Sequence, residues 1–176
     1  MKTKTEKILS VLRVLAWLGV FGYAIDFGSQ VICFVVSFKN PAAAKQIPDI
    51  AQNLSNLMNY NFSFYVFAMI FVMALSAMFI YLWYQVAELL SKLSVESPFT
   101  IQVAQKLNKI AYWLVAIWVV SVIGKIYTGW LSKHIGGQLN LITIGNEFLF
   151  TAGIVFIVSQ IFRRGIEIQE ENQQTI

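Results

Sequence analysis

Three charged side chains that could do chemistry stand inside otherwise apolar stretches of the sequence. Asp26, Lys125 and Glu147 each lie in or at the edge of a hydrophobic run of the length that crosses a lipid bilayer. An ionised side chain at the centre of a transmembrane helix costs about 2.5–3.5 kcal/mol on insertion scales. Such a residue is tolerated where other segments shelter it or an opposite charge pairs with it. Two carboxylates and one ammonium therefore predict a polar pocket for a cation, a proton or a small ligand.

The three charged residues are expected at a similar depth. Each lies about 20 to 24 Å along its helix from a basic residue that should stand near the inner membrane surface, at about 1.5 Å per residue. The hydrocarbon core is about 30 Å thick, so all three charges should reach its outer part. The alternatives to a pocket are a structural ion pair or triad, or the extension of Lys125 and Glu147 to the lipid surface. The basic residues used as inner markers are Arg13, Lys109 and Arg163.

The composition is that of an integral membrane protein. Hydrophobic residues make up 57 % of the 176 residues and charged residues only 12 %, whereas an ordinary soluble domain is about 25 % charged. The apolar runs are continuous rather than alternating, which predicts helices. A helix also satisfies its own backbone hydrogen bonds in lipid.

The pattern predicts an all-α, polytopic membrane protein in which four transmembrane helices form a bundle, together with short amphipathic interfacial helices. One such interfacial segment is expected from Ile50 onward, and another where the third helix begins, around residues 99–110. We expect one domain over residues 1–176. The expected spans are 8–38, 62–90, 110–131 and 147–163, with a cytoplasmic tail at 165–176 that stays helical for one or two turns.

The basic residues predict the orientation. With both termini inside, nine lysines and arginines face the cytoplasm and four face the other side, and positive charge collects on the cytoplasmic side. We therefore predict a multi-pass protein of the inner (plasma) membrane with cytoplasmic N- and C-termini. The cytoplasmic set is Lys2, Lys4, Lys7, Arg13, Lys92, Lys106, Lys109, Arg163 and Arg164, and the opposite set is Lys39, Lys45, Lys125 and Lys133.

Several classes of chemistry lack the residues they need. The single cysteine, Cys33, and the single histidine, His134, provide neither an intrachain disulfide nor a metal site. The sequence contains no nucleophile and base at motif spacing and no glycine-rich phosphate loop. We expect no enzyme activity, no cofactor and no metal. The net charge of +4 is attributed to membrane orientation rather than to direct nucleic-acid binding.

Two motifs resemble a known family. One is Glu96-Ser-Pro-Phe-Thr followed by Leu107-Asn-Lys-Ile110, and the other is Ile161-Phe-Arg-Arg-Gly-Ile-Glu-Ile-Gln-Glu-Glu-Asn172 with the ending Thr175-Ile176. Together with four spans at this length, they resemble a bacterial family of small membrane proteins classed as a domain of unknown function. The resemblance implies a membrane location and a four-helix body. It also implies a gene neighbour, a small repressor-like helix-turn-helix regulator.

Acidic residues in the tail predict a contact on the cytoplasmic side. Glu167, Glu170 and Glu171 stand at a helix C-terminus, where the macrodipole disfavours negative charge. They would be better placed against Lys106 and Lys109, so we predict that the tail docks there and forms a partner-binding surface. A solvated tail is the alternative.

These observations favour a non-enzymatic regulatory, sensor or immunity-like membrane protein with a cytoplasmic partner surface. The alternative is a small transporter or channel subunit that uses the polar pocket in the outer leaflet. The expected partners are the lipid bilayer, a cytoplasmic helix-turn-helix regulator and further copies of the same chain.

Overall fold

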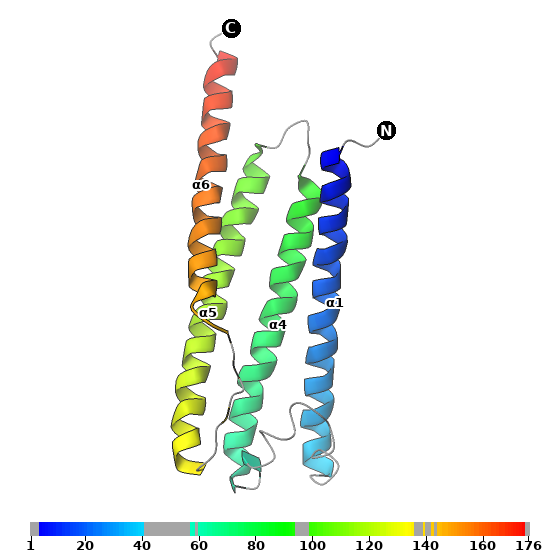
Figure 1. The fold of residues 1–176 in the computed structure, drawn as a ribbon, viewed down its shortest axis with the longest axis vertical. Coiled ribbons are helices and arrows are strands. Elements are labelled where there is room, and N and C mark those ends of the chain that lie inside the picture. Colours follow the sequence, from blue (N-terminus) through cyan, green and yellow to red (C-terminus); the bar gives the residue numbers. More distant parts are fainter. Residues whose placement is uncertain are drawn as a thin grey trace. The chain divides into compact units, whose positions relative to one another are not determined.

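The computed structural model describes residues 4–40, 57–58, 60–93, 99–135, 139, 142 and 144–174. Four long helices account for nearly all of them, and these ranges contain no strand (Figure 1). The prediction of an all-α fold is confirmed. The helices are α1 (Lys4–Lys39), α4 (Phe62–Lys92), α5 (Ile101–Ile135) and α6 (Glu147–Gln174).

All four helices are long and apolar enough to cross a membrane, which makes the chain a multi-pass membrane protein. The 36 residues of α1 and the 35 of α5 exceed what the lipid core requires. At about 1.5 Å per residue each is over 50 Å long, against a core of about 30 Å. Both helices therefore continue into the aqueous or headgroup regions.

Polar caps determine where two of the helices begin. The side chain of Asn61 accepts a hydrogen bond of 2.9 Å from the backbone N–H of Ser63 at the start of α4. Thr100 Oγ1 accepts one of 3.4 Å from the N–H of Val103 at the start of α5. Caps of this kind satisfy backbone donors that the first turn of a helix leaves without partners.

The chain forms two compact units. Unit 1 comprises Met1–Phe21, Ile80–Ala116 and Asn146–Ile176, and unit 2 comprises Gly22–Phe79 and Ile117–Gly145. The helices α1, α4 and α5 contribute to both units, whereas α6 belongs to unit 1. The prediction that residues 1–176 form a single domain stays a prediction.

Aromatic rings join the four helices of unit 1. Trp17 of α1 meets Tyr84 of α4 edge to face, with ring centroids 6.4 Å apart. The centroids of Tyr81 on α4 and Trp113 on α5 are 4.7 Å apart. Two further ring pairs, Tyr112–Phe156 and Phe99–Phe162, join α5 and its leading residues to α6. Unit 1 is thus a bundle of four helices.

Unit 2 packs around an apolar cluster with polar members. Gly124 of α5 allows a close approach, because a Cβ there would collide with the side chain of Ile142. Ser37 of α1 and Tyr65 of α4 share a buried hydrogen bond of 2.6 Å between their hydroxyl groups. The buried members of the cluster are Cys33, Leu57, Tyr65, Ala68, Met69, Leu131 and Leu139.

The third and fourth helices differ in extent from their predicted spans. The amphipathic segment around residues 99–110 is the first part of α5, as predicted, and its apolar residues Val103 and Ala104 are buried in protein; α5 continues to Ile135 rather than ending near residue 131. The tail is helical to Gln174, nearly three turns past Arg164 rather than one or two. The amphipathic segment predicted from Ile50 lies largely outside the described residues.

Candidate functional site

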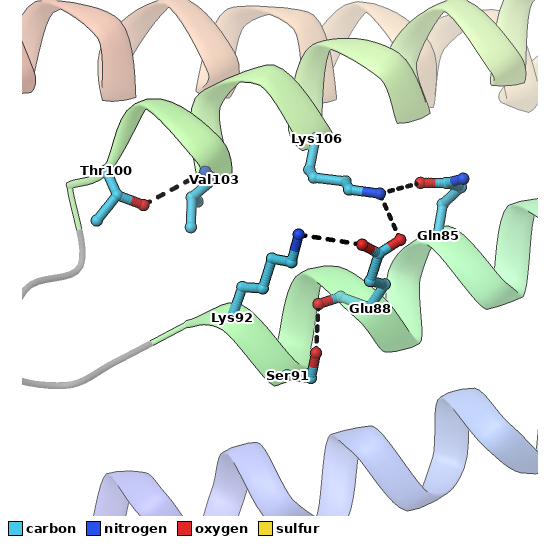
Figure 2. Close-up of polar contacts among 7 residues, drawn as sticks. All are labelled: Gln85, Glu88, Ser91, Lys92, Thr100, Val103 and Lys106. Atoms are coloured by element: carbon cyan, nitrogen blue, oxygen red, sulfur yellow. Dashed lines mark hydrogen bonds and ion pairs between the residues drawn. The ribbon is translucent and has the colours of Figure 1, made fainter.

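A cluster of polar side chains lies between α4 and α5 in unit 1, with Glu88 at its centre. Lys92 Nζ lies 3.1 Å from Glu88 Oε1, and the ammonium of Lys106 pairs with the other carboxylate oxygen, Oε2. Lys106 Nζ also donates a hydrogen bond of 2.9 Å to Gln85 Oε1. Figure 2 shows Lys106 reaching from α5 toward both α4 residues. We call these four residues the Glu88 cluster.

Helical spacing assembles the Glu88 cluster. Gln85, Glu88 and Lys92 follow one another at three- and four-residue steps, which places them on one face of α4. Lys106 completes the cluster from the second turn of α5. The order of Glu88 and Lys92 is the favourable one for an i,i+4 pair.

Burial differs between the members of the Glu88 cluster. Gln85 is 3 % exposed, so its side-chain oxygen depends on Lys106 for its hydrogen bond. The side chains of Lys106 and Glu88 are 18 % and 26 % exposed, and that of Lys92 is 40 % exposed. Lys106 is therefore the residue that joins the buried part of the cluster to its solvent-facing part.

Two further cations of unit 1 bind α4 near the Glu88 cluster. The guanidinium of Arg13 on α1 donates a hydrogen bond of 3.0 Å to the carbonyl of Leu90. Leu90 lies in the last turn of α4, where backbone carbonyls lack partners within the helix. Lys109 Nζ lies 5.9 Å from the centroid of the Tyr81 ring, a cation–π distance. Basic residues of α1 and α5 thus contact the C-terminal half of α4, Arg13 in its last turn and Lys109 about three turns before its end.

The predicted outer pocket is not assembled around an Asp26–Lys125 pair. Asp26 is exposed on α1, and the ammonium of Lys125 donates to the backbone carbonyl of Ile144. Both residues belong to unit 2, and no ion pair joins them. Glu147 begins α6 in unit 1, and its backbone carbonyl accepts a hydrogen bond of 2.7 Å from the Thr151 hydroxyl. A ligand-binding role for the three charged residues stays a prediction.

The predicted docking of the acidic tail also stays a prediction. The ammonium of Lys106 forms an ion pair with Glu88 and donates a hydrogen bond to Gln85. Glu167 pairs with Arg164 one turn before it, at 2.7 Å between Oε2 and Nη1. Glu170 and Glu171 are exposed on the same helix.

Sequence reasoning did not identify two buried amide contacts, Gln85 with Lys106 and Gln30 with Ser76. Gln30 Nε2 donates a hydrogen bond of 2.8 Å to Ser76 Oγ within unit 2, and both residues are buried. Gln30 Oε1 is buried with no hydrogen-bond partner among the described residues. Each of the two glutamines stands inside an apolar run of the sequence, and a polar residue in such a run indicates a helix face that turns inward. That position was the signal by which the two contacts could have been found.

The chemistry available to the Glu88 cluster is electrostatic. Across the described ranges, no group of three or more His, Cys, Asp and Glu side chains could hold a metal ion. The Glu88 cluster joins a single carboxylate to two ammonium groups. Its geometry can clamp two helices together and can present positive charge at the membrane surface.

A comparison with known proteins agrees with the resemblance seen in the two motifs. The family model described as "Protein of unknown function (DUF2975)" matches residues 40–176. No curated protein and no solved structure matches the chain. Since the match covers well over half of the chain, including α4, α5 and α6, this four-helix membrane protein belongs to the DUF2975 family.

Proposed function

We propose that this protein is a non-enzymatic regulator in the inner membrane that binds a cytoplasmic partner through the C-terminal part of α6. The observation that carries the proposal is the helical continuation of α6 beyond its apolar residues. Past Arg163 and Arg164 the helix runs on to Gln174, and the residues from Glu167 to Asn172 are all exposed. We call this segment, residues 165–174, the α6 extension.

The start of the α6 extension is held by an aromatic contact. The Phe99 and Phe162 ring centroids lie 5.1 Å apart, and a Cβ on Gly165 would come within 2.8 Å of the Phe99 ring. Glycine at 165 thus lets the ring lie directly on the helix backbone. A helix anchored at its base can present its exposed residues in a fixed geometry, which lowers the entropic cost of binding a partner.

The chemistry of the α6 extension indicates the kind of partner. Glu171 lies one turn after Ile168 on the same side of the helix, and Glu167 precedes it; the surface of Ile168 is 46 % exposed. An exposed apolar residue with acids beside it fits a partner surface that combines a small apolar recess with lysines or arginines. The distribution of basic residues along the chain supports a cytoplasmic location for this segment. The resemblance noted in the sequence names a soluble helix-turn-helix regulator as the candidate, and such proteins carry basic surfaces.

The test is a binding measurement between the purified full-length protein in lipid nanodiscs and the purified regulator encoded beside it. We expect measurable binding that weakens with salt, and a loss of at least tenfold in affinity when Glu167, Glu170 and Glu171 are all changed to glutamine. A matched control carries Lys4→Gln and Lys7→Gln, two exposed charges at the start of α1, and should bind as the wild type does.

Two outcomes would contradict the proposal. One is binding that is unchanged in the triple glutamine variant. The other is no binding to the regulator together with solute flux in proteoliposomes, which would instead favour a transporter or channel subunit.

A further inference from the structure

We propose that α1 carries a self-association surface, formed by Gly22, Asp26 and Ser29, which packs against the same surface of a second copy of this chain. The three residues follow one another at four- and three-residue steps, so they share one face of the helix. All three are exposed, and a Cβ added to Gly22 would meet no atom within 4 Å. All three also belong to unit 2.

The same face of α1 is buried farther along the helix. The four-residue steps continue from Ser29 to Cys33 and Ser37, which are 3 % and 2 % exposed. There the Ser37 hydroxyl bonds to the backbone carbonyl of Cys33 and to the hydroxyl of Tyr65 on α4. This face is therefore a helix-packing face at Cys33 and Ser37, and it is exposed from Ser29 toward the N-terminus, where the apolar Leu18 and Leu15 follow Gly22.

Asp26 makes the uncovered part costly in a membrane. It lies about 20 Å along α1 from Arg13, which leaves about 10 Å to the outer surface of a core about 30 Å thick, too far for its short side chain to reach. A charged residue inside a span costs up to about 2.5–3.5 kcal/mol on insertion scales. A partner that brings a hydrogen-bonding group to this depth would remove much of that cost.

A second copy meets this requirement by symmetry. Copies of one chain insert in the same orientation, so a two-fold axis along the membrane normal would bring Asp26 to face Asp26 at equal depth. In such a contact the Ser29 hydroxyl of each copy can donate a hydrogen bond to the Asp26 side chain of the other. Within one chain Lys125, the basic residue of unit 2 expected at a similar depth, donates a hydrogen bond from its ammonium to the carbonyl of Ile144.

The small residues beside Asp26 allow the contact to be close. Gly22 and Ser29 flank the carboxylate one turn before it and one turn after it. Transmembrane helices associate where such residues let the backbones approach, and polar side chains then bond across the interface. Only 6 % of the most apolar 18-residue stretch of α1 is buried by the rest of the chain, so this helix has surface available for a neighbouring helix.

The first test is disulfide cross-linking in native membranes. Full-length protein with Cys33→Ala carries one new cysteine, either Ser29→Cys on the proposed surface or Ala24→Cys as the control. Ala24 is exposed at nearly the same depth but points about 160° away from Asp26 around the helix. We expect a cross-linked dimer with S29C and at least tenfold less with A24C. Equal cross-linking of the two variants, or more with A24C, would overturn the proposal.

The second test measures the dimer directly, by subunit counting over a dilution series in lipid vesicles. Asp26→Asn keeps a side chain that can both donate and accept, so dimers should persist. Asp26→Leu removes these bonds and should raise the dissociation constant at least tenfold, while the gain in apolarity leaves insertion intact. An unchanged dissociation constant in D26L would contradict the proposal. A wild-type protein that stays monomeric, or that binds a different membrane protein through α1, would also contradict it. Neither test involves the α6 extension, so the outcome is independent of the proposed regulator.

Discussion

Lys106 is the side chain on which the buried part of the Glu88 cluster depends. It is the only residue of the cluster that reaches the buried oxygen of Gln85, and it bridges α5 to α4. Lys92 binds the same carboxylate from within α4 and is more exposed. The two lysines therefore contribute differently, although both pair with Glu88.

A change of Lys106 to methionine should destabilise the protein more than the same change at Lys92. Loss of Lys106 leaves the buried Gln85 oxygen without its partner, which costs about 1–3 kcal/mol. Loss of Lys92 removes an exposed pair within one helix, and such pairs contribute little. Thermal unfolding in detergent, followed by circular dichroism, is the measurement. Equal melting temperatures for K106M and K92M would show that the Gln85 contact is unimportant.

At the scale of the helices, glycine positions decide how closely α1 and α4 pack in unit 1. A Cβ on Gly19 would come within 2.6 Å of the Trp83 ring and within 2.9 Å of two further ring atoms. Gly28 lies on the same helix, but a Cβ there would meet nothing within 4 Å. The indole thus uses the space that the missing side chain leaves at position 19.

The two glycines predict opposite effects of substitution by alanine. In a helix interior alanine is favoured over glycine by about 1 kcal/mol, so G28A should be neutral or stabilising. G19A should be destabilising, because Trp83 must move away from α1 and contacts of its ring are lost. Chemical unfolding of both variants in the same detergent gives the comparison. A stabilised G19A would mean that Trp83 repacks freely.

The four helices could be predicted from the sequence, whereas their side-chain partners could not. Uninterrupted apolar runs determine where helices lie, and α4 begins at Phe62 as expected. Periodicity predicted that the third helix begins near residue 99, but it could not show that Val103 and Ala104 in its first turn are buried in protein. Depth along a helix placed the three intramembrane charges at similar levels. It could not show that Lys125 bonds to a backbone carbonyl, since that contact depends on the path of the chain near Ile144.

At the scale of the whole molecule, the distribution of basic residues predicts which ends of the helices face the cytoplasm. The excess of lysines and arginines lies on the side of the two termini. The proposed function requires this orientation, because the α6 extension must meet a soluble partner inside the cell.

Cysteine accessibility tests the orientation. In a Cys33→Ala background, His134→Cys at the end of α5 should react with a membrane-impermeant maleimide on intact cells. Asn172→Cys in the α6 extension should react only after the cells are opened. Both positions are exposed, so a difference in labelling reports the side of the membrane rather than burial. Labelling of Asn172→Cys on intact cells would reverse the orientation and rule out a cytoplasmic regulator.

The lone thiol of Cys33 gives this protein a built-in reporter of breathing motions. It is 3 % exposed within the apolar cluster of unit 2, between α1, α4 and α5. A thiol reagent can reach the sulfur only when those helices part, so the reaction rate at low reagent excess measures how often that cluster opens. Without any introduced cysteine, the reaction rate of the wild-type chain therefore reports whether a bound molecule or a neighbouring copy tightens this cluster.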